Sequence, residues 1–319
     1  MIKKKRKKRT LLIISFIILL SVIYALADRY LIEHVEIIVQ DQVEDAVATA
    51  APESIQYNDA VPTSSPESIQ YDDWNYISDE IKISINKVEN GSGSDKVTYY
   101  AADIKLKDSK SLRSAFAKGA FGRNIIENTS KIASDNNALF AINGDYYGFR
   151  GDGVIIRNGI LYRDVPERIS AAFLQDGSMM IFDEKVISSS DLLQQGVIDT
   201  LSFGPVLVDE GKVVSYEGQV VVDPNFGNWP IQDLNPRTGI GMIEPNHFIF
   251  IIVDGRMYDY SKGMTLLEFS SLFADLGCTV AYNLDGGGSS TMYFMGRVVN
   301  NPLGKQTQRG VSDILYIEN

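Results

Sequence analysis

The sequence predicts an α+β fold, a single domain built on a mixed, largely antiparallel sheet with a few helices. Short apolar runs alternate with turn signals from about Ile77 onward, as expected for many strands. Pairs of these runs flank a polar residue followed by glycine, which predicts hairpins at Asn158-Gly159, Asp176-Gly177 and Glu210-Gly211. Only a few segments show the hydrophobic periodicity of a helix, so fewer helices than strands are expected.

The elements can be assigned in chain order. "IKISINKV" and "KVTYYAADIKL" are expected as strands, and the stretch from "SKSLRSAFAKG" to "ENTSKIASDNN" as helical. The three hairpins follow, and "GIGMIEPNHFIFIIVDGRMY" adds two strands. Thr265, with Glu268 three residues later, forms a capping box and predicts a helix whose buried side includes Phe269 and Phe273. "TVAYNL", "TMYFMGRVVN" and "SDILYIE" complete the strands.

The N-terminus predicts a membrane anchor. Residues 1–9 carry seven Lys and Arg, expected in the cytoplasm, and residues 10–27 carry no charge. As a helix, these 18 residues would rise about 27 Å, close to the thickness of a bilayer core. A cleaved signal peptide is the alternative, because Ala25-Leu26-Ala27 has the form of a cleavage site. Apolar residues resume at "YLIEHVEIIV", which favours an uncleaved single-pass anchor with the domain outside the cell.

Residues 28–76 are expected to form a flexible stalk, with the domain at residues 77–319. The stalk contains "PESIQY" twice, at 52–57 and 66–71. Such a polar segment, rich in Pro, Ser and Glu, buries too little apolar surface to fold. A duplicated recognition motif is the alternative interpretation.

Charge and composition exclude several classes of protein. The formal net charge of −11 becomes −18 without the seven basic N-terminal residues, so the exported part lacks the basic face that nucleic acid requires. With Cys278 as the single cysteine, no intramolecular disulfide is possible. Two histidines and one cysteine argue against a zinc site, and His34 and His247 offer little to a Ser-His-Asp hydrolase.

The most informative stretch is "NLDGGGSSTM", at the end of an apolar run. No lysine follows its glycines, which excludes a P-loop, and Thr291 replaces the second glycine of a nucleophile elbow. Asp285 precedes three glycines, whose lack of Cβ lets backbone N–H groups approach a ligand. A tight turn is the alternative. Other polar groups gather in "AINGDYYGFRGDG", "NPRTGIGM", "VDGRMYDYSKGM" and "TQRGVSD".

Each of these groups also has a structural interpretation. Asp254-Gly255 is typical of an ordinary hairpin turn, and Asp145 could cap its own loop. Arg237, Arg256 and Arg309 could be surface ion partners, which contribute little to stability.

The same segments resemble the phosphodiester glycosidase family. The resemblance rests on "NGDYYGF", "GPVLV", "NPRTGIGM", "RGVSDILYI" and the long block "IIVDGRMYDYSKGMTLLEFSSLFADLGCTVAYNLDGGGSSTMYF". It spans about residues 143–317, and residues 254–292 are its most specific part. It implies hydrolysis of a sugar 1-phosphodiester at the anomeric C–O bond, with bacterial members associated with exopolysaccharide.

The implied reaction assigns roles to the polar residues. A phosphate leaving group is already a weak base, so positive charge around its oxygens matters more than a proton donor. Guanidinium groups suit that task. We therefore expect a site in which Arg237 and Arg309 bind the phosphate and Asp285 or Asp145 stabilises the sugar cation and activates water. The remaining expected substrate-binding residues are Asn143, Tyr147, Thr238, Asp254, Arg256, Asn283, Gly286, Gly287, Gly288 and Ser289.

Substrate and cofactor remain broader predictions. A glycan phosphodiester of the cell wall or of exopolysaccharide is the expected substrate. No cofactor is expected, although the carboxylates and the glycine-rich loop could hold a Ca²⁺ ion. The alternatives in function are a non-enzymatic wall- or exopolysaccharide-binding module and a phosphodiesterase that cuts the P–O bond.

Overall fold

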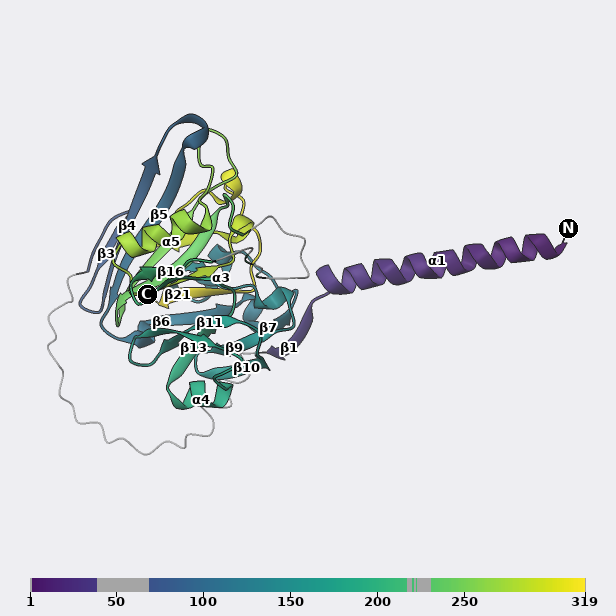
Figure 1. Cartoon of the computed structure of the whole chain (residues 1–319), viewed down its shortest axis with the longest axis horizontal. Helices are drawn as coiled ribbons and strands as arrows, with labels where there is room; N and C mark the ends of the chain where they lie inside the picture. The colour runs from purple at the N-terminus through teal and green to yellow at the C-terminus, as the bar shows by residue number, and fades with distance from the viewer. Residues whose placement is uncertain (1, 39–68, 217–219, 221, 223–230, 319) are drawn as a thin grey trace, which may run out of the picture.

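The computed structural model describes residues 2–38, 69–216, 220, 222 and 231–318. Two stacked sheets form the body of the domain, and a long N-terminal helix projects from it (Figure 1). Every strand pairing among the described residues is antiparallel. The α+β prediction is confirmed.

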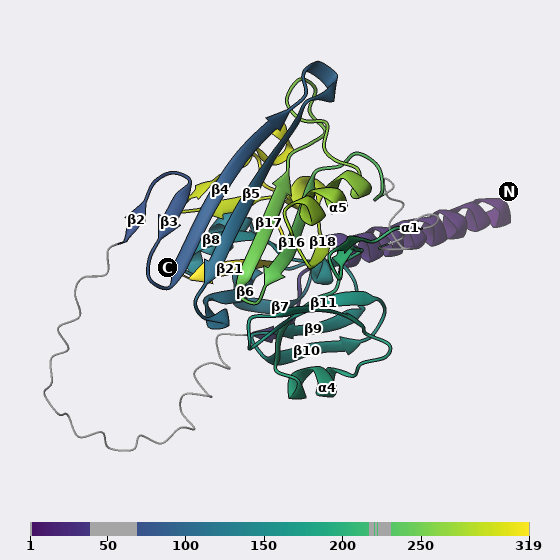
Figure 2. The ribbon, with the colours of Figure 1, turned by 60° about the vertical axis from the view of Figure 1, so that its left-hand side comes forward.

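The larger sheet has nine strands, and Figure 2 shows its central strands side by side. In spatial order they are β15 (Lys212–Val213), β14 (Val206–Asp209), β18 (Val280–Leu284), β16 (Arg237–Glu244), β17 (His247–Val253), β5 (Val97–Leu106), β4 (Ile81–Asn90), β3 (Asn75–Ile77) and β2 (Gln70–Tyr71).

The second sheet has five strands: β20 (Arg297–Val298), β19 (Met292–Phe294), β8 (Ala138–Asn143), β21 (Asp313–Glu318) and β6 (Leu112–Phe116). A smaller lobe contains β12 (Met179–Asp183), β11 (Ile169–Leu174) and β13 (Val197–Leu201), the hairpin of β9 (Gly153–Arg157) and β10 (Ile160–Val165), and α4 (Ser189–Gln194). A two-stranded ribbon pairs β1 (His34–Ile38) with β7 (Ala120–Arg123).

The main core lies between the two large sheets. Phe250 of β17 packs edge-on against Phe140 of β8, with ring centroids 5.2 Å apart. Helix α5 (Leu266–Asp275) covers the other face of the nine-stranded sheet through Phe269 and Phe273. Helix α3 (Thr129–Asp135) covers the outer face of the five-stranded sheet through Ile132. These four layers hold the ends of β8, β16 and β18 close together.

Some of the predicted local elements are confirmed and one is wrong. The hairpins at residues 158–159, 176–177 and 210–211 are confirmed, and α5 begins with the predicted capping box. The expected helix over residues 109–119 is wrong, because Leu112–Phe116 is a strand of the five-stranded sheet. Leu112, Ser114 and Phe116 are buried while Arg113 is exposed, so the segment follows the period of two of a strand rather than that of a helix.

The segment expected as a stalk is partly built into the domain. Strand β1 pairs with β7, and β2 and β3 extend the nine-stranded sheet. The prediction of flexibility therefore fails at residues 34–38 and 70–77, because their backbone groups complete edges of sheets. Residues 39–68, with the first "PESIQY" copy, lie outside the described residues.

Helix α1 (Ile2–Tyr30) contains the predicted apolar segment. By length and composition, Leu12–Arg29 is long and apolar enough to cross a membrane, and none of these residues is buried in the domain. Figure 1 shows α1 leaving the domain next to β1.

Strand β1 depends on a glycine in β7, which gives a first prediction. A Cβ at Gly122 would overlap the carbonyl oxygen of His34, so Gly122→Ala should displace β1. We expect a loss of about 1–3 kcal/mol in the free energy of unfolding, measured with urea, and faster proteolysis near residue 34. Gly151→Ala is the control, since a Cβ there meets no atom within 4 Å. Equal stability of the two variants would contradict the prediction.

Candidate active site

The candidate active site is built around the loop that follows β18. Asp285 Oδ2 accepts hydrogen bonds from Ser289 Oγ at 2.6 Å and from Arg309 Nη2 at 2.8 Å. Arg309 also donates to Ser289 Oγ, from Nε at 3.0 Å and from Nη2 at 2.7 Å. The three side chains therefore fix one another. Within the described part of the chain, Asp285 Oδ1 has no hydrogen-bond partner.

The glycines shape this loop through close backbone contacts. A Cβ on Gly286 would lie 2.6 Å from the carbonyl oxygen of Pro236, so only glycine fits there. The Gly287 amide donates to Pro236 at 3.1 Å, and the Ser289 amide donates to Gly286 at 3.2 Å. Two of the amides expected to meet a ligand are thus used inside the fold.

Arg237, the first residue of β16, lies buried beneath this loop. Its Nε donates to the Met264 carbonyl at 3.0 Å and its Nη2 to the Asp233 carbonyl at 2.6 Å. Burial, together with the nearby charge of Arg256, lowers the pKa of Arg237 to about 10. Arg237 therefore carries its positive charge close to a second cation.

Arg256 is that second cation, and it lies over the glycine loop. A Cβ added to Gly287 would lie 3.4 Å from Nη1 of Arg256, so the guanidinium is in van der Waals contact with the loop. Its Nη2 donates a hydrogen bond to Asn235 Oδ1 at 2.7 Å. Burial and the charge of Arg309 lower the pKa of Arg256, and the charge of Asp285 opposes this. Two guanidinium groups, of Arg256 and Arg309, thus lie near one carboxylate, with Arg237 close to Arg256, an arrangement suited to an anion.

Asn143, at the end of β8, connects the two sheets beside this loop. Its Oδ1 accepts from Thr238 Oγ1 at 2.9 Å and from the Thr291 amide at 3.2 Å. Its Nδ2 donates to the carbonyl of Asp285 at 2.8 Å. Asn143 and Thr238 are fully buried, so their side chains position the loop rather than meet a ligand.

A buried ion network lies directly behind Asn143. Arg157, fully buried at the end of β9, donates to Asp313 Oδ2 from Nε at 2.9 Å and from Nη2 at 2.7 Å. The same Nη2 lies 3.2 Å from Asp145 Oδ2. Asp145 also accepts the amides of Tyr147 at 2.8 Å and Ser202 at 3.0 Å. One cation therefore joins the small lobe to two carboxylates of the five-stranded sheet and its loop.

The carboxylates of this network differ in pKa. Burial favours a raised pKa at Asp145, but the charges of Arg157 and Arg150 outweigh it and hold that pKa below its ordinary value. At Asp313 burial prevails over the attraction of Arg157 and raises the pKa to about 7. Burial also raises the pKa of nearby Asp199 to about 6. The ionised form is favoured at Asp145 and disfavoured at Asp313.

Tyr147 lies in the core behind the site. Its ring stacks on Phe121 with centroids 5.1 Å apart, and its hydroxyl donates to the Ser312 carbonyl at 3.2 Å. The side chain is fully buried, so it presents no surface to a sugar.

Asp254 and Asn283 are also buried. Asp254 accepts from the Asn300 side chain at 2.8 Å and the Asn301 amide at 3.0 Å, which ties the turn after β17 to the residues after β20. Asn283 donates to the Gly204 carbonyl at 2.8 Å, while its Oδ1 is buried without a partner among the described residues.

The structure thus divides the predicted site residues into two groups. The first, which we call the loop cluster, contains Asp285, Gly286, Gly287, Gly288, Ser289, Arg256 and Arg309, with Arg237 beneath it. Arg256 and Arg309 are exposed, Asp285 is 9% exposed, and Gly288 and Ser289 are buried. The buried support contains Asn143, Asp145, Tyr147, Thr238, Asp254 and Asn283. Sequence reasoning missed Arg157, because it precedes the Asn158-Gly159 turn and looked like part of a hairpin. A charged residue ending the apolar run "GVII" was the available signal.

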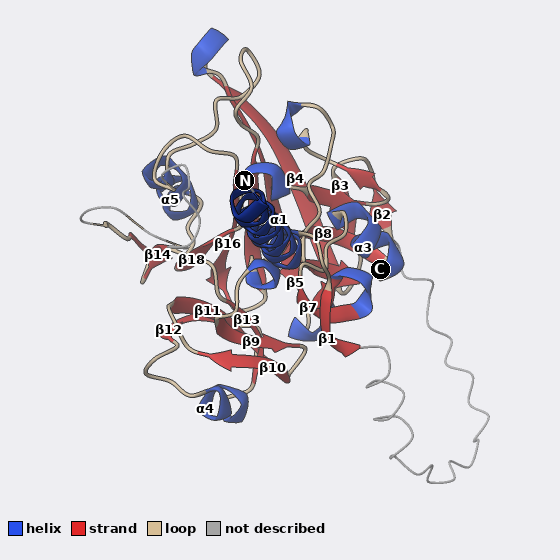
Figure 3. Cartoon of the chain, turned by 90° about the vertical axis from the view of Figure 1, so that its right-hand side faces the viewer, coloured by secondary structure: helices blue, strands red, loops and turns tan. Residues whose placement is uncertain are grey.

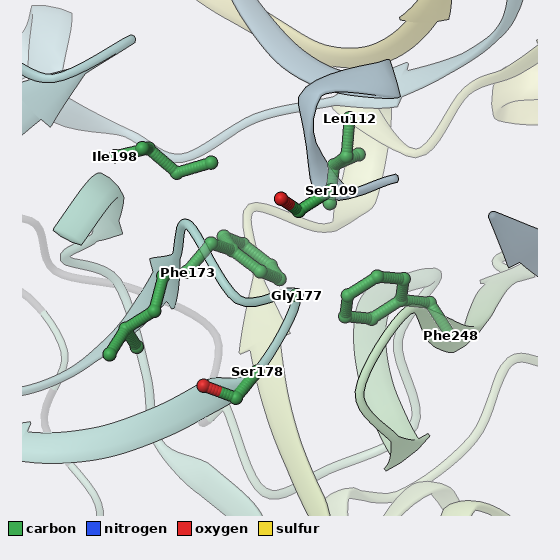
Figure 4. Close-up of a pocket in the computed structure, with 8 residues that line it drawn as sticks. Ser109, Leu112, Phe173, Gly177, Ser178, Ile198 and Phe248 are labelled. Atoms are coloured by element: carbon green, nitrogen blue, oxygen red, sulfur yellow. The ribbon is translucent and has the colours of Figure 1, made fainter. Parts of the chain in front are cut away.

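The site does not coincide with the hollow drawn in Figure 4. That hollow lies between β6, β11, β13 and β17, is too narrow for a water molecule and is lined by Leu112, Phe173 and Phe248 among others. None of the predicted site residues lines it. The described residues also contain no group of three or more His, Cys, Asp or Glu side chains that could hold a metal ion. A calcium requirement therefore stays a hypothesis.

Comparison with known proteins places this geometry in a family. A family model described as phosphodiester glycosidase matches residues 136–318, more than half of the chain. The chain belongs to the phosphodiester glycosidase family. All the residues of the loop cluster and of the buried ion network fall within residues 136–318.

The chain is also similar to two individual proteins. The SPbeta prophage-derived uncharacterized protein YomE of Bacillus subtilis is 29% identical over 204 residues, which cover 62% of this chain and only 30% of that relative. The catalytic domain of zebrafish N-acetylglucosamine-1-phosphodiester alpha-N-acetylglucosaminidase, auto-inhibited by its pro-peptide, superposes with a TM-score of 0.59 at 20% identity. The superposition covers 75% of this chain and 83% of the zebrafish chain, and it shows that the two domains share a fold.

Arg157 gives a second prediction. Arg157→Met leaves Asp145 and Asp313 buried without their cation, so we expect a loss of about 3–5 kcal/mol in the free energy of unfolding. Arg113→Met is the matched control, because Arg113 forms an exposed pair with Glu318 and should cost at most about 1 kcal/mol. Urea unfolding of both variants measures the difference. Similar losses in both would refute the structural role of Arg157.

Asp313 gives a prediction for pH. The pKa of Asp313 is raised from an ordinary value of about 3.9, so its contribution to stability is fully present below that value and declines as the pH rises to about 7. Asp313→Asn removes this titration. The substitution should therefore cost more stability at pH 4 than at pH 8, measured by urea unfolding. Exposed Asp275→Asn is the control, and an equal cost of Asp313→Asn at both pH values would contradict the prediction.

Proposed function

We propose that the chain is a hydrolase that cleaves a sugar 1-phosphodiester at the anomeric C–O bond, acting on glycan material of the cell wall or exopolysaccharide. The proposal rests first on the family, whose description names this activity. The observation that carries it to this chain is the positive charge at the Asp285 loop, where Arg309 pairs with Asp285, Arg256 lies close enough to feel its charge, and Arg237 lies near Arg256.

In this proposal, Arg256 and Arg309 bind the phosphate from the accessible side and Arg237 adds charge from beneath. The amides of Gly286 and Gly288 would add donors to the same oxygens. A phosphate that is stabilised in this way leaves without a proton from a carboxylic acid. The guanidinium groups therefore supply the main stabilisation of the leaving group in the transition state.

Asp285 takes the carboxylate role in the proposal. Ser289 and Arg309 hold its Oδ2, and its Oδ1 has no partner in the described part of the chain, so it can face C1 of the sugar. There it would stabilise the oxocarbenium-like charge and activate the attacking water. Asp145 was the other candidate for this role. Its burial in the pair with Arg157 supports a positioning role for Asp145 instead.

We further propose that the protein is anchored in the cell membrane by α1, with the domain outside the cell. The apolar length of residues 12–29 and the seven preceding basic residues support this orientation. An exported domain held in this way would meet wall and exopolysaccharide phosphodiesters.

Asp285→Asn tests the carboxylate role. We expect kcat on a p-nitrophenyl sugar phosphodiester to fall by roughly 10²- to 10⁴-fold, because the carboxylate acts on the reacting carbon and water. Asp275→Asn, an exposed aspartate at the end of α5, is the control and should keep its rate. If Asp285→Asn keeps the wild-type rate across a panel of sugars, the assignment of the carboxylate is wrong.

Hydrolysis in ¹⁸O-labelled water tests the bond that breaks. Attack at C1 puts the label in the released sugar, whereas attack at phosphorus puts it in the phosphate. We expect label in the sugar, measured by mass spectrometry of both products. Label in the phosphate would show a P–O phosphodiesterase, and saturable polysaccharide binding without any turnover would instead support a binding module.

A further inference from the structure

The connection between α1 and the domain is short and tightly bound. Only residues 31–33 separate the end of α1 from the start of β1. We call residues 28–38 the neck. Asn124 Nδ2 donates to the neck carbonyls of Asp28 at 3.0 Å and Ile32 at 2.9 Å, and Lys118 forms an ion pair with Glu33. The neck is thus fixed to the domain at its beginning, middle and end.

This topology removes the expected stalk from between the membrane and the domain. Strand β1 pairs with β7 immediately after α1, and Ile37 packs against the aromatic cluster that contains Phe121 and Tyr147. Residues 39–68 then connect β1 to β2, two strands of the same domain. The distance of the domain from the membrane is therefore set by the neck and not by the segment with the repeat.

The loop that binds the neck also contacts the candidate site. The Asn124 amide donates to the Gly148 carbonyl at 2.8 Å, in the turn that follows Asp145. Glu127 and Val311 exchange two backbone hydrogen bonds, at 3.0 and 2.8 Å. The Ile126 side chain packs beside Gly310, the residue next to Arg309. Residues 123–128 therefore lie between the end of α1 and the site's arginine.

Exposed apolar side chains lie among charged ones on the face around the neck, where Glu33, Glu36 and Arg123 are also exposed. Figure 3 views the domain from the side on which α1 leaves it, with β1 and β7 next to the helix. Leu31, Ile32, Val35 and Ile126 are all exposed on or beside the neck, and Leu303 is exposed where it packs against Gly288 of the site loop. Apolar side chains flanking a membrane helix are suited to the bilayer interface.

We infer that this face rests on the membrane and that the substrate is a lipid-linked sugar phosphodiester, in which phosphate joins C1 of a sugar to a lipid alcohol. The inference rests on the proposed function and specifies its substrate. The arginines would then meet the phosphate at the depth of the lipid headgroups, with the sugar towards Asp285. Water adds its oxygen to C1, the C1–O bond breaks with its electron pair kept by the phosphate, and the water proton leaves through Asp285. The lipid monophosphate stays in the bilayer.

An insertion experiment tests the inference in the full chain. Wild type and two variants are reconstituted in phosphatidylglycerol–phosphatidylethanolamine vesicles. One variant carries about twelve Gly and Ser residues after Glu33, which frees the domain from the membrane. The matched control carries the same insertion after Ser64, in the segment that joins β1 to β2. The probes are glucose, galactose and N-acetylglucosamine 1-phosphodiesters of a polyprenyl alcohol, each with a soluble p-nitrophenyl counterpart.

The insertion after Glu33 should lower release of sugar from the lipid-linked diester by at least about ten-fold, since the site loses its high local concentration of substrate. It should leave the soluble diester unaffected, and the insertion after Ser64 should leave both rates unchanged. Hydrolysis of the soluble diester alone, or equal rates for the two variants on the lipid-linked diester, would overturn the inference. Failure with both kinds of diester would instead overturn the proposed function.

A fluorescence measurement tests the membrane contact without activity. Because Cys278 is the single cysteine and is buried, an introduced cysteine can be labelled selectively. Ile126→Cys and Ile77→Cys are matched, with exposures of 38% and 40%, and Ile77 lies on β3, across the domain from α1 (Figure 2). Brominated lipids should quench a label at residue 126 and spare one at residue 77. Equal quenching at the two positions would exclude the proposed orientation.

Discussion

The guanidinium of Arg157 is the interaction on which the site depends most. It lies fully buried between Asp145 and Asp313, and it also donates to the carbonyls of Ile156 and Thr200. A buried charge is costly unless it is paired and fully hydrogen-bonded, so this group admits little displacement. It fixes the loop after β8 against β21 and the small lobe against both. The positions of Asn143, and through it of the Asp285 loop, follow from this constraint.

The residues that hold the site together and the residues that can meet a ligand lie in different places around Arg157. The buried amides and carboxylates end strands of both sheets and hydrogen-bond to one another, while the charged groups that can meet a ligand lie in one loop and its neighbours. A loop that is anchored through backbone carbonyls, as at Asp285 and Pro236, keeps its shape when its side chains change partners. Such preorganisation is what stabilisation of a charged transition state requires.

Local features of the fold were predictable from the sequence and distant pairings were not. The Asn158-Gly159 turn and the Thr265 cap depend on neighbouring residues only, so their signals survive in a single chain. The same holds for Asp285, whose setting at a strand end before three glycines is local. Arg157 and Asp313 are 156 positions apart in the sequence, and no local sequence pattern predicts that they form an ion pair. Residues 34–38 were predicted as part of a flexible stalk for the same reason, because they form a strand only by pairing with the distant β7.

The position of β21 has a consequence for how the protein folds. This strand, Asp313–Glu318, pairs with β6 on one side and β8 on the other, so it lies inside the second sheet between strands from a much earlier part of the sequence. Asp313, which pairs with Arg157, is the first residue of this strand. Formation of this sheet and its ion pair therefore requires contacts between residues about 150 to 200 positions apart. Contacts of such long range make folding slow, because the entropy of closing a long loop must be overcome before the contacts stabilise the fold.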